Sequence, residues 1–353
     1  MKIAIITDTH FGARNDSQLF LDHFGDFFTG LFFPTLRRYD INTVIHVGDL
    51  LDRRKYINFN TLSSVRENFM EPLKKMDITI HCIIGNHDTY YKNTNDLNSV
   101  KELFADKYDN FILYEKPETV NFDGFDIALL PWINKENHDK SLDFINSTTA
   151  QWLIGHLELD GYEVFRGIKY EGGLDPKIFN RFEQVLSGHF HCKHERGNVI
   201  YLGSPYQLTF SDVNDVKGFW ILDTDTRELE FIKNDNSVFY NIIYDDSKKD
   251  YSNFISKKHL KYKNKYVKIY VVNKTKPYIL DRVIDSLYNS GVYDLTVVEE
   301  VDEPTRGGDI EKTDITKSTL ELIYQEVNNI KDIENPNRIK DLIKELYMES
   351  LKE

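Results

Sequence analysis

The chain has 353 residues, 41% of them hydrophobic, and this length is more typical of two or three structural units than of one. It contains no run of roughly 18 to 20 apolar residues, which argues against a membrane span, and its start MKIAIITDTH has no signal-peptide pattern. Only two cysteines, Cys82 and Cys192, are present, and the formal net charge is −13. The composition therefore excludes a disulfide framework and a positive field over the whole chain, and it predicts a cytoplasmic globular protein.

Short apolar runs rich in Ile and Val, flanked by Gly or Asp, predict buried strands. They lie at residues 2–6, 43–47, 78–84, 126–130, 151–154, 184–186, 199–202 and 218–222. Helical patterns at residues 17–38 and 60–75 separate the early runs. Strand and helix therefore alternate, which favours an α/β fold of packed layers. The later runs follow one another more closely, with turn residues between them, and this indicates a mixed or antiparallel sheet.

A small separate unit is indicated after about residue 245. A strand near residues 266–272, a helix near 278–290 and a strand near 295–301 form a β-α-β pattern. The next residues, DEPTRGGDIEKT, are polar and contain Gly and Pro, as linkers do. We therefore expect a main domain of residues 1–245, a small domain of residues 246–302, a linker of residues 303–315 and a helical segment of residues 316–353.

The helical segment has apolar residues at helical spacing on both sides of Asn335-Pro336, which predicts two amphipathic helices. Both are short and follow a linker, so a groove on a partner protein is one destination for their apolar faces. Packing against the main domain is the alternative.

A basic segment runs from Lys257 to Lys276, with tyrosines between its lysines and no acidic residue. Lysines alternating with aromatic residues suit a nucleic-acid backbone, and a solvated strand face explains them equally well. The lysines that we consider for DNA binding are Lys257, Lys258, Lys261, Lys263 and Lys265.

Side chains suited to metal binding follow the carboxyl ends of five predicted strands. They are Asp8, His10, Asp49, Asn86, His156, His189 and His191. Because ligands collect at this edge of an α/β sheet, we expect these side chains to converge. Several follow a glycine, which we expect to permit a tight backbone turn. One such residue is typical of a helix cap or a turn, but five motifs in series favour a common site.

The mixture of carboxylate, imidazole and amide groups without thiolate fits two divalent ions, with Mn²⁺ favoured and Mg²⁺, Fe²⁺ or Zn²⁺ as alternatives. The set is larger than one tetrahedral ion needs, so a pair of ions sharing a carboxylate is the simplest interpretation. Two such ions suit hydrolysis of a phosphate ester by in-line displacement.

The motifs D8-x-H10, GD49, GN86HD88, GH156 and GH189-x-H191 resemble those of the calcineurin-like metallophosphoesterase superfamily. The stretch NVIYLGSPYQLTFSD and the following KGFWILDTDT are similar to the end of the nuclease domain in SbcD-type double-strand-break repair nucleases. Over essentially the whole chain, the sequence resembles the SbcD-like subunits of T-even-type phage recombination endonucleases. This resemblance implies a layered metallophosphoesterase sandwich with mixed sheets, a β-α-β capping domain and a C-terminal helix-loop-helix.

The resemblance also implies roles for individual residues. One ion would be held by Asp8, His10, Asp49 and His191, and the other by Asp49, Asn86, His156 and His189. His87 would stabilise developing charge or protonate the leaving oxygen, and Asp88 would orient it. Some relatives carry a His where this chain has Asp52, so a second catalytic imidazole is not implied. Arg53 and Arg54 would follow the DNA backbone, with a solvated surface as the alternative.

The function implied is that of a manganese-dependent DNA nuclease, a duplex-end exonuclease and single-strand endonuclease in recombination and double-strand-break repair. Its expected partners are DNA, an SbcC-type coiled-coil ABC ATPase bound through the C-terminal helices, and a second copy of the chain, in the cytoplasm of a host cell if the chain is phage-encoded. A general phosphodiesterase or phosphoprotein phosphatase is one alternative, although it needs neither cap nor tail. A non-catalytic scaffold is another, although the complete ligand set argues against it.

Overall fold

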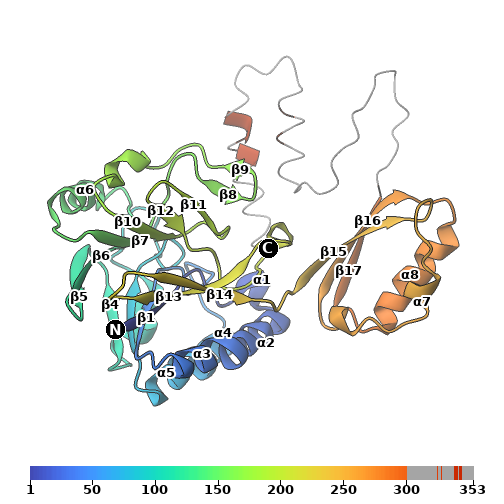
Figure 1. Ribbon diagram of the computed structural model, residues 1–353, viewed down its shortest axis with the longest axis horizontal. Coiled ribbons are helices and arrows are strands. Elements are labelled where there is room, and N and C mark those ends of the chain that lie inside the picture. Colours follow the sequence, from blue (N-terminus) through green and yellow to red (C-terminus); the bar gives the residue numbers. More distant parts are fainter. Residues whose placement is uncertain (300–323, 325–326, 328–337, 341, 344–353) are drawn as a thin grey trace. The chain divides into compact units, whose positions relative to one another are not determined.

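The computed structural model describes residues 1–299, 324, 327, 338–340 and 342–343 (Figure 1). They form a larger unit of residues 1–208 and 214–236 and a smaller unit that includes residues 209–213 and 237–299. The predicted linker 303–315 lies outside the described residues, as does almost all of the helical segment 316–353. No helix in the described part of the chain is long and apolar enough to cross a membrane.

The larger unit contains two six-stranded sheets (Figure 1). In order across the first sheet, the strands are β14 (Leu229–Asn234), β13 (Lys217–Asp223), β1 (Lys2–Ile6), β2 (Thr43–His46), β3 (Thr79–Ile83) and β4 (Phe111–Tyr114). In order across the second sheet, they are β11 (His194–Arg196), β12 (Val199–Tyr201), β10 (Gln184–Gly188), β7 (Trp152–His156), β6 (Phe125–Leu130) and β5 (Glu118–Phe122).

Both sheets are parallel in the middle and antiparallel toward an edge. Strands β1 to β4 are parallel to one another, and β13 joins β1 antiparallel. Strands β6, β7, β10 and β12 are likewise parallel, while β5 and β11 pair antiparallel at the two edges. The parallel centres bring several strand ends to one edge of each sheet.

The main core lies between the two sheets. Ile3, Ile5 and Ile45 from the first sheet belong to one buried cluster with Ile127 and Ile154 from the second. These strands are Ile-rich and Val-rich without alternation because both of their faces are covered.

Helices cover the outer face of the first sheet (Figure 1). One helical run consists of α2 (Gln18–Phe27), the π-helical turn Phe28–Phe32 and α3 (Phe33–Arg38), and the other consists of α4 (Phe59–Val65), the π-helical turn Arg66–Met70 and α5 (Glu71–Lys75). Phe27 and Phe32 contact Phe219 of β13, and Phe69 contacts His46 of β2. The predicted helices at residues 17–38 and 60–75 are therefore confirmed.

Shorter elements complete the larger unit. They are α1 (Ala13–Asp16), the π-helical turn Lys101–Ala105, α6 (His138–Ser147), β8 (Glu163–Phe165), β9 (Ile168–Lys169) and the 3-10 turn Pro176–Phe179. Within α1, Arg14, Asn15 and Asp16 have φ of 55°, 62° and 58°, so this segment is a left-handed turn rather than a right-handed helix.

The smaller unit is a parallel sheet of β15 (Phe239–Asp245), β16 (Tyr266–Asn273) and β17 (Asp294–Glu299), packed against α7 (Ser252–Ile255) and α8 (Pro277–Asn289). It also contains the 3-10 turns Phe210–Asp212 and Leu260–Tyr262. Val267, Ile269, Leu280, Val283 and Leu287 form its core. The sequence grouped residues 239–245 with the main domain, whereas in the structure this strand pairs with β16.

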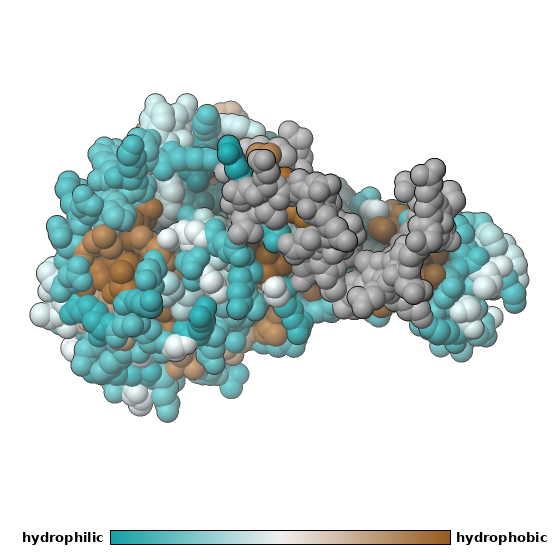
Figure 2. All heavy atoms as spheres, turned by 90° about the horizontal axis from the view of Figure 1, so that it is seen from above, coloured by the Kyte–Doolittle hydropathy of each residue, from teal (hydrophilic) through white to brown (hydrophobic). Residues whose placement is uncertain are grey.

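The predicted fold class is confirmed, because both sheets of the larger unit are mixed and helices pack in layers against a sheet. Hydrophilic side chains cover most of the described surface in Figure 2, as expected for a chain of net charge −13. The edge strands β5 and β11 escaped prediction because they are short and carry exposed polar residues, and β4 escaped it because its apolar run is short.

Candidate metal centre

The structure brings all seven predicted metal-binding side chains together. Asp8 and His10 follow β1, Asp49 follows β2, and Asn86 follows β3, and these strands are parallel neighbours in the first sheet. His156 ends β7, while His189 and His191 follow β10, its parallel neighbour in the second sheet. The facing strand ends of two sheets therefore supply the candidate site.

The first group contains Asp8, His10, Asp49 and His191. The Nε2 atoms of His10 and His191 lie 3.0 Å apart. The Oδ1 atom of Asp8 lies 3.8 Å from His10 Nε2 and 3.7 Å from His191 Nε2. The Oδ2 atom of Asp49 lies 3.7 Å from His10 Nε2. Two carboxylate oxygens therefore face two imidazole nitrogens around one point.

The second group contains Asp49, Asn86, His156 and His189. The amide oxygen of Asn86 is 2.9 Å from Nε2 of His156 and 2.9 Å from Nδ1 of His189. The same Oδ2 atom of Asp49 that approaches His10 lies 3.4 Å from Nε2 of His156. Asp49 is therefore common to both groups.

This donor set fits a pair of divalent cations. Each group offers carboxylate and imidazole atoms, the second adds an amide oxygen, and neither includes a thiolate. The Nδ1 atom of His156 donates to the main-chain oxygen of Val47 at 2.8 Å, which leaves its Nε2 to face Asp49. A backbone partner of this kind fixes the tautomer that a metal-binding histidine needs.

Strained backbone holds several of these side chains in place. Asp8, His10, Asp49 and His189 have φ of 51°, 42°, 55° and 88°, in the left-handed region that residues with a Cβ rarely adopt. Each such residue costs on the order of 1–3 kcal/mol and persists only where surrounding contacts determine it. Four strained residues in one cluster indicate that the loops serve the site rather than stability.

Most glycines of the motifs are needed because neighbouring loops pack closely against them, and fewer are needed to turn the backbone. A Cβ on Gly85 would lie 2.3 Å from the main-chain nitrogen of Asp49, and one on Gly188 would lie 2.2 Å from Oγ1 of Thr7. Only Gly48, with φ of 88°, also needs the left-handed region. The expected tight turn therefore applies to Gly48, whereas at Gly85 and Gly188 the reason is the contact between loops.

The buried charges of the site are strongly coupled. Burial tends to raise the pKa of Asp8, but the hydrogen bond to His10 and the charges of His156 and His191 hold it well below its usual value. Burial lowers the pKa of His156, yet the charge of Asp49 outweighs this effect and raises it to about 9. The carboxylates are therefore ionised and attract positive charge into a buried site.

His87 lies at the edge of this centre. Its Nδ1 donates to the main-chain oxygen of Asp52 at 2.6 Å, and its main-chain nitrogen donates to Oδ1 of Asp49 at 2.7 Å. The rings of His87 and His10 are 4.8 Å apart and nearly perpendicular. Oδ1 of Asp52 is 3.2 Å from Nδ1 of His10. Asp52 therefore contacts the imidazoles of both His87 and His10. The only sign of this contact in the sequence is that Asp52 lies three residues after Asp49.

The expected contact between Asp88 and the His87 ring is wrong. The buried Asp88 carboxylate instead accepts hydrogen bonds from the main-chain nitrogens of Gly85, Asp49, Leu50 and Leu51, at 2.9, 2.9, 3.0 and 3.4 Å. Burial and the charge of Asp49 raise the pKa of Asp88 to about 7, against the effect of these backbone hydrogen bonds. Asp88 therefore joins two motif loops rather than aligning His87.

The two arginines after Asp49 have internal partners. Arg53 donates to Oδ2 of Asp16 at 2.9 Å and also bonds Asn15, so it secures the left-handed turn of α1. Arg54 donates to Oγ1 of Thr89 at 3.3 Å, and its guanidinium lies 5.6 Å from the centre of the Trp132 ring. Arg53 is thus paired with an acid, while Arg54 lies beside an aromatic ring close to the Asn86 loop.

The basic segment belongs to the smaller unit. Lys257, Lys258, Lys261 and Lys263 are exposed, and Lys265 is half-buried. Tyr262 and Tyr266 are buried in the core of that unit, so they cannot stack on nucleic-acid bases. This part of the predicted pattern is therefore a row of lysines alone.

Lys217 and Tyr206 support the site but were not found from the sequence. The Tyr206 hydroxyl donates to the main-chain oxygen of Thr9 at 2.6 Å, and the Lys217 ammonium donates to that of His191 at 2.8 Å. Both are buried and both act on the backbone of a motif. The sequence offered one sign of these roles, the position of Lys217 at the start of an apolar strand.

The fold and the site define a phosphoesterase. The sequence model of the calcineurin-like phosphoesterase family matches residues 1–217, and the chain belongs to this family. Three of its relatives are named as nuclease subunits or as a DNA repair protein.

Exonuclease subunit 1 of Enterobacteria phage T4 is 34% identical over 355 residues, which cover 99% of each chain. The SbcD subunit of the nuclease SbcCD from Staphylococcus epidermidis is 25% identical over 263 residues, which cover 65% of this chain and 67% of the relative. DNA double-strand break repair protein Mre11 of Nanoarchaeum equitans is 24% identical over 248 residues, which cover 63% of this chain and 66% of the relative.

Proposed function

We propose that this protein is a manganese-dependent DNA nuclease that acts in recombination and double-strand-break repair. The observation that carries the proposal is the position of Asp49, whose Oδ2 atom lies between the two histidine-containing groups. Full-length similarity to a phage exonuclease subunit supports DNA as the substrate.

One divalent ion is assigned to Asp8, His10, Asp49 and His191, and the other to Asp49, Asn86, His156 and His189. When bound, such a pair lowers the pKa of a coordinated water and neutralises charge on the phosphate. We favour Mn²⁺ because the ligands mix carboxylate, amide and imidazole, with Mg²⁺ as the other choice.

His87 is assigned the stabilisation of charge on the phosphate or the leaving oxygen. The hydrogen bond from its Nδ1 to the carbonyl of Asp52 fixes the orientation of the imidazole at the edge of the centre. Asp88 holds the loops of Asp49 and Asn86 at a fixed separation, so it acts as a positioning residue. The strained backbone at Asp8 and Asp49 fixes both carboxylates before substrate arrives.

The relatives from phage T4 and Staphylococcus epidermidis are both named as nuclease subunits, so we propose a partner subunit for this chain too. An SbcC-type ATPase with a coiled coil, bound by the helices of residues 316–353, is the proposed partner. A homodimer through the α2–α5 surface is also proposed, since Phe59 at the start of α4 is 87% exposed. The exposed lysines of the smaller unit are assigned to DNA.

Cleavage of end-labelled duplex and single-stranded DNA in Mn²⁺ tests the function, with a phosphopeptide and a cyclic nucleotide as competing substrates. We expect turnover of DNA to exceed that of both small substrates, and addition of the ATPase to increase it. Preferential hydrolysis of the phosphopeptide or the cyclic nucleotide would replace the nuclease by a general phosphoesterase.

A further inference from the structure

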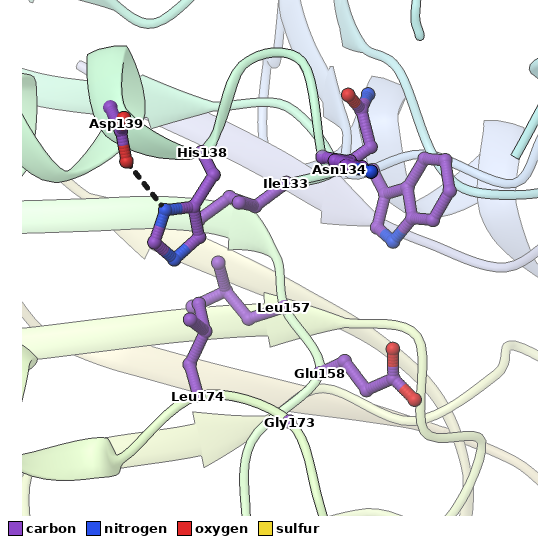
Figure 3. A pocket seen from close by; sticks show the side chains of 10 residues that line it. Ile133, Asn134, His138, Asp139, Leu157, Glu158, Gly173 and Leu174 are labelled. Carbon is purple, nitrogen blue, oxygen red and sulfur yellow. Dashed lines mark hydrogen bonds and ion pairs between the residues drawn. The ribbon is translucent and has the colours of Figure 1, made fainter. Parts of the chain in front are cut away.

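A pocket of about 410 Å³ opens in the larger unit next to the candidate metal centre. Figure 3 shows Ile133, Leu157 and Leu174 in its wall, with Glu158 following Leu157 along the chain. Trp132 also lines the pocket. None of these residues has a role in the ligand set described above, so the pocket requires its own explanation.

The walls of the pocket continue directly into two motif loops. Leu157 is the residue after His156, and the main-chain nitrogen of Trp132 donates to the main-chain oxygen of Ile84, two residues before Asn86, at 2.8 Å. Glu158, the next residue of the lining, is only two residues from His156 along the chain. A phosphate held at the metal centre would therefore have this pocket beside it.

The wall that carries Trp132 is held by hydrogen bonds. The main-chain oxygen of Trp132 accepts from the side-chain amides of Asn95 at 3.1 Å and Asn137 at 3.0 Å. Asn134 in turn donates to the side chain of Asn95 at 2.8 Å, and both of these asparagines are buried. The indole is thus carried on a preformed loop.

The opposite wall is equally fixed. The main-chain nitrogen of Leu174 donates to the main-chain oxygen of Glu158 at 2.9 Å. A Cβ on Gly173 would lie only 2.4 Å from that same oxygen, so the two segments are closer than any residue other than glycine would permit. A cavity between two fixed walls keeps its width, which suits a flat ligand.

The chemistry of the lining selects the ligand. Leucine and isoleucine side chains and an indole provide apolar and aromatic surface, while the carboxylate of Glu158 accepts no hydrogen bond from any described residue. The basic residues Lys135 and His138 of the lining are balanced by the acidic Glu158 and Asp139, and His138 pairs with Asp139 at 2.9 Å. The lining therefore has no excess of positive charge for a phosphate, whereas a heterocycle with N–H donors is compatible with the Glu158 carboxylate. The volume of the pocket is in the range of small-ligand pockets, so it suits one nucleoside and is too small for a double helix.

We propose that this pocket receives one unpaired nucleobase from the strand being cut, next to the phosphate under attack. The proposal rests on the proposed nuclease function and adds a base-binding subsite to it. Because an unpaired base enters such a pocket without the cost of breaking a base pair, the pocket favours single strands and frayed ends. Contact with the indole supplies binding that depends little on which base is present.

Single-stranded oligonucleotides with one abasic nucleotide test the subsite, because every other bond in the same molecule is an internal control. We expect the wild-type protein to cut the bond on one side of the abasic nucleotide roughly tenfold less often than distant bonds. Leu174→Trp and Ile133→Trp fill the pocket, so in both variants the flanking and distant bonds should be cut alike.

Ile112→Trp is the matched control, since Ile112 is an exposed residue on β4 and does not line the pocket. This variant should keep the tenfold difference between the flanking and distant bonds. The ratio is independent of the fraction of folded protein, so a partly unfolded variant still gives an answer.

Equal cutting of flanking and distant bonds by the wild-type protein would overturn the subsite. The subsite would also be overturned if Leu174→Trp and Ile133→Trp both kept the tenfold difference between flanking and distant bonds. The pocket would then be open to another occupant, such as a peptide of the partner subunit. Failure of the nuclease function looks different, because no bond in any oligonucleotide would then be cut.

Discussion

The ammonium group of Lys217 donates a hydrogen bond of 2.8 Å to the main-chain oxygen of His191. It also donates to Oγ of Ser204 at 3.0 Å and lies 3.7 Å from the carboxylate of Asp215, in a site where the Lys217 side chain is only 3% exposed. A buried cation therefore holds the loop that carries one of the proposed metal ligands.

Lys217→Met should lower the free energy of unfolding by about 3 kcal/mol, because it removes the cation that faces the buried Asp215 carboxylate. It should also weaken binding of one Mn²⁺ more than the other, since only the His191 loop is released. Calorimetric titration with Mn²⁺ measures this difference, and Lys217→Arg should restore much of it. If the affinity for both ions fell equally, or did not fall at all, the role of Lys217 would be purely structural. Lys233→Met on the exposed surface is the control.

His87→Ser should retain both ions and lose most DNA cleavage, with the barrier raised by roughly 2 to 4 kcal/mol. The reason is that His87 is assigned to the phosphate and to neither ion, and its hydrogen bond to the proposed ligand Asp49 comes from the main-chain nitrogen, which the variant keeps. Single-turnover cleavage and bound manganese should be measured on the same sample. A variant that cleaves at nearly the wild-type rate would exclude His87 from catalysis.

Asp88→Asn tests the clamp between the two motif loops. One side-chain oxygen becomes an NH₂ group that faces backbone N–H donors, and each unsatisfied group costs about 1–3 kcal/mol. We therefore expect a lower midpoint of thermal unfolding together with weaker metal binding. If Asp88 acted by orienting His87, the variant would instead lose cleavage at unchanged stability.

His81 should make stability depend on pH. Burial lowers the pKa of His81 from 6.5 to about 4 in the folded chain, where it lies 2.7 Å from the Tyr114 hydroxyl. The neutral form is thus favoured by folding, so its contribution is complete above pH 6.5 and is lost as the pH falls toward 4. Between pH 7 and pH 5 the loss is at most about 2 kcal/mol.

Urea unfolding of the wild-type protein and of His81→Phe at pH 7 and pH 5 measures this contribution. The variant should lose less stability over this interval, because it has no imidazole to protonate at this position. Equal losses in the two proteins would mean that His81 does not titrate between the folded and unfolded states.

Much of the fold could be predicted because buried parallel strands and long amphipathic helices leave strong patterns. Residues 2–6 and 17–38 are examples, and the structure places β1 and the α2–α3 run there. The position of candidate ligands after glycines at strand ends was equally visible. Short polar edge strands such as β5 and β11 lack any such pattern.

Contacts that depend on side-chain direction could not be predicted. The sequence places Asp88 beside His87, but adjacent residues in a turn point in different directions, and Asp88 turns to the amides of Gly85 and Asp49. Lys217 and Trp132 are distant from the motifs in sequence and reach them only through the folded chain. Their roles therefore emerge from tertiary structure alone.

The claim that one carboxylate joins two ions is tested most directly by electron paramagnetic resonance of the manganese-loaded protein. The position of Asp49 predicts two Mn²⁺ per chain whose spins are coupled, and Asp49→Asn should abolish the coupling or empty the site. A single bound ion, or two uncoupled ions that persist in Asp49→Asn, would contradict a shared centre.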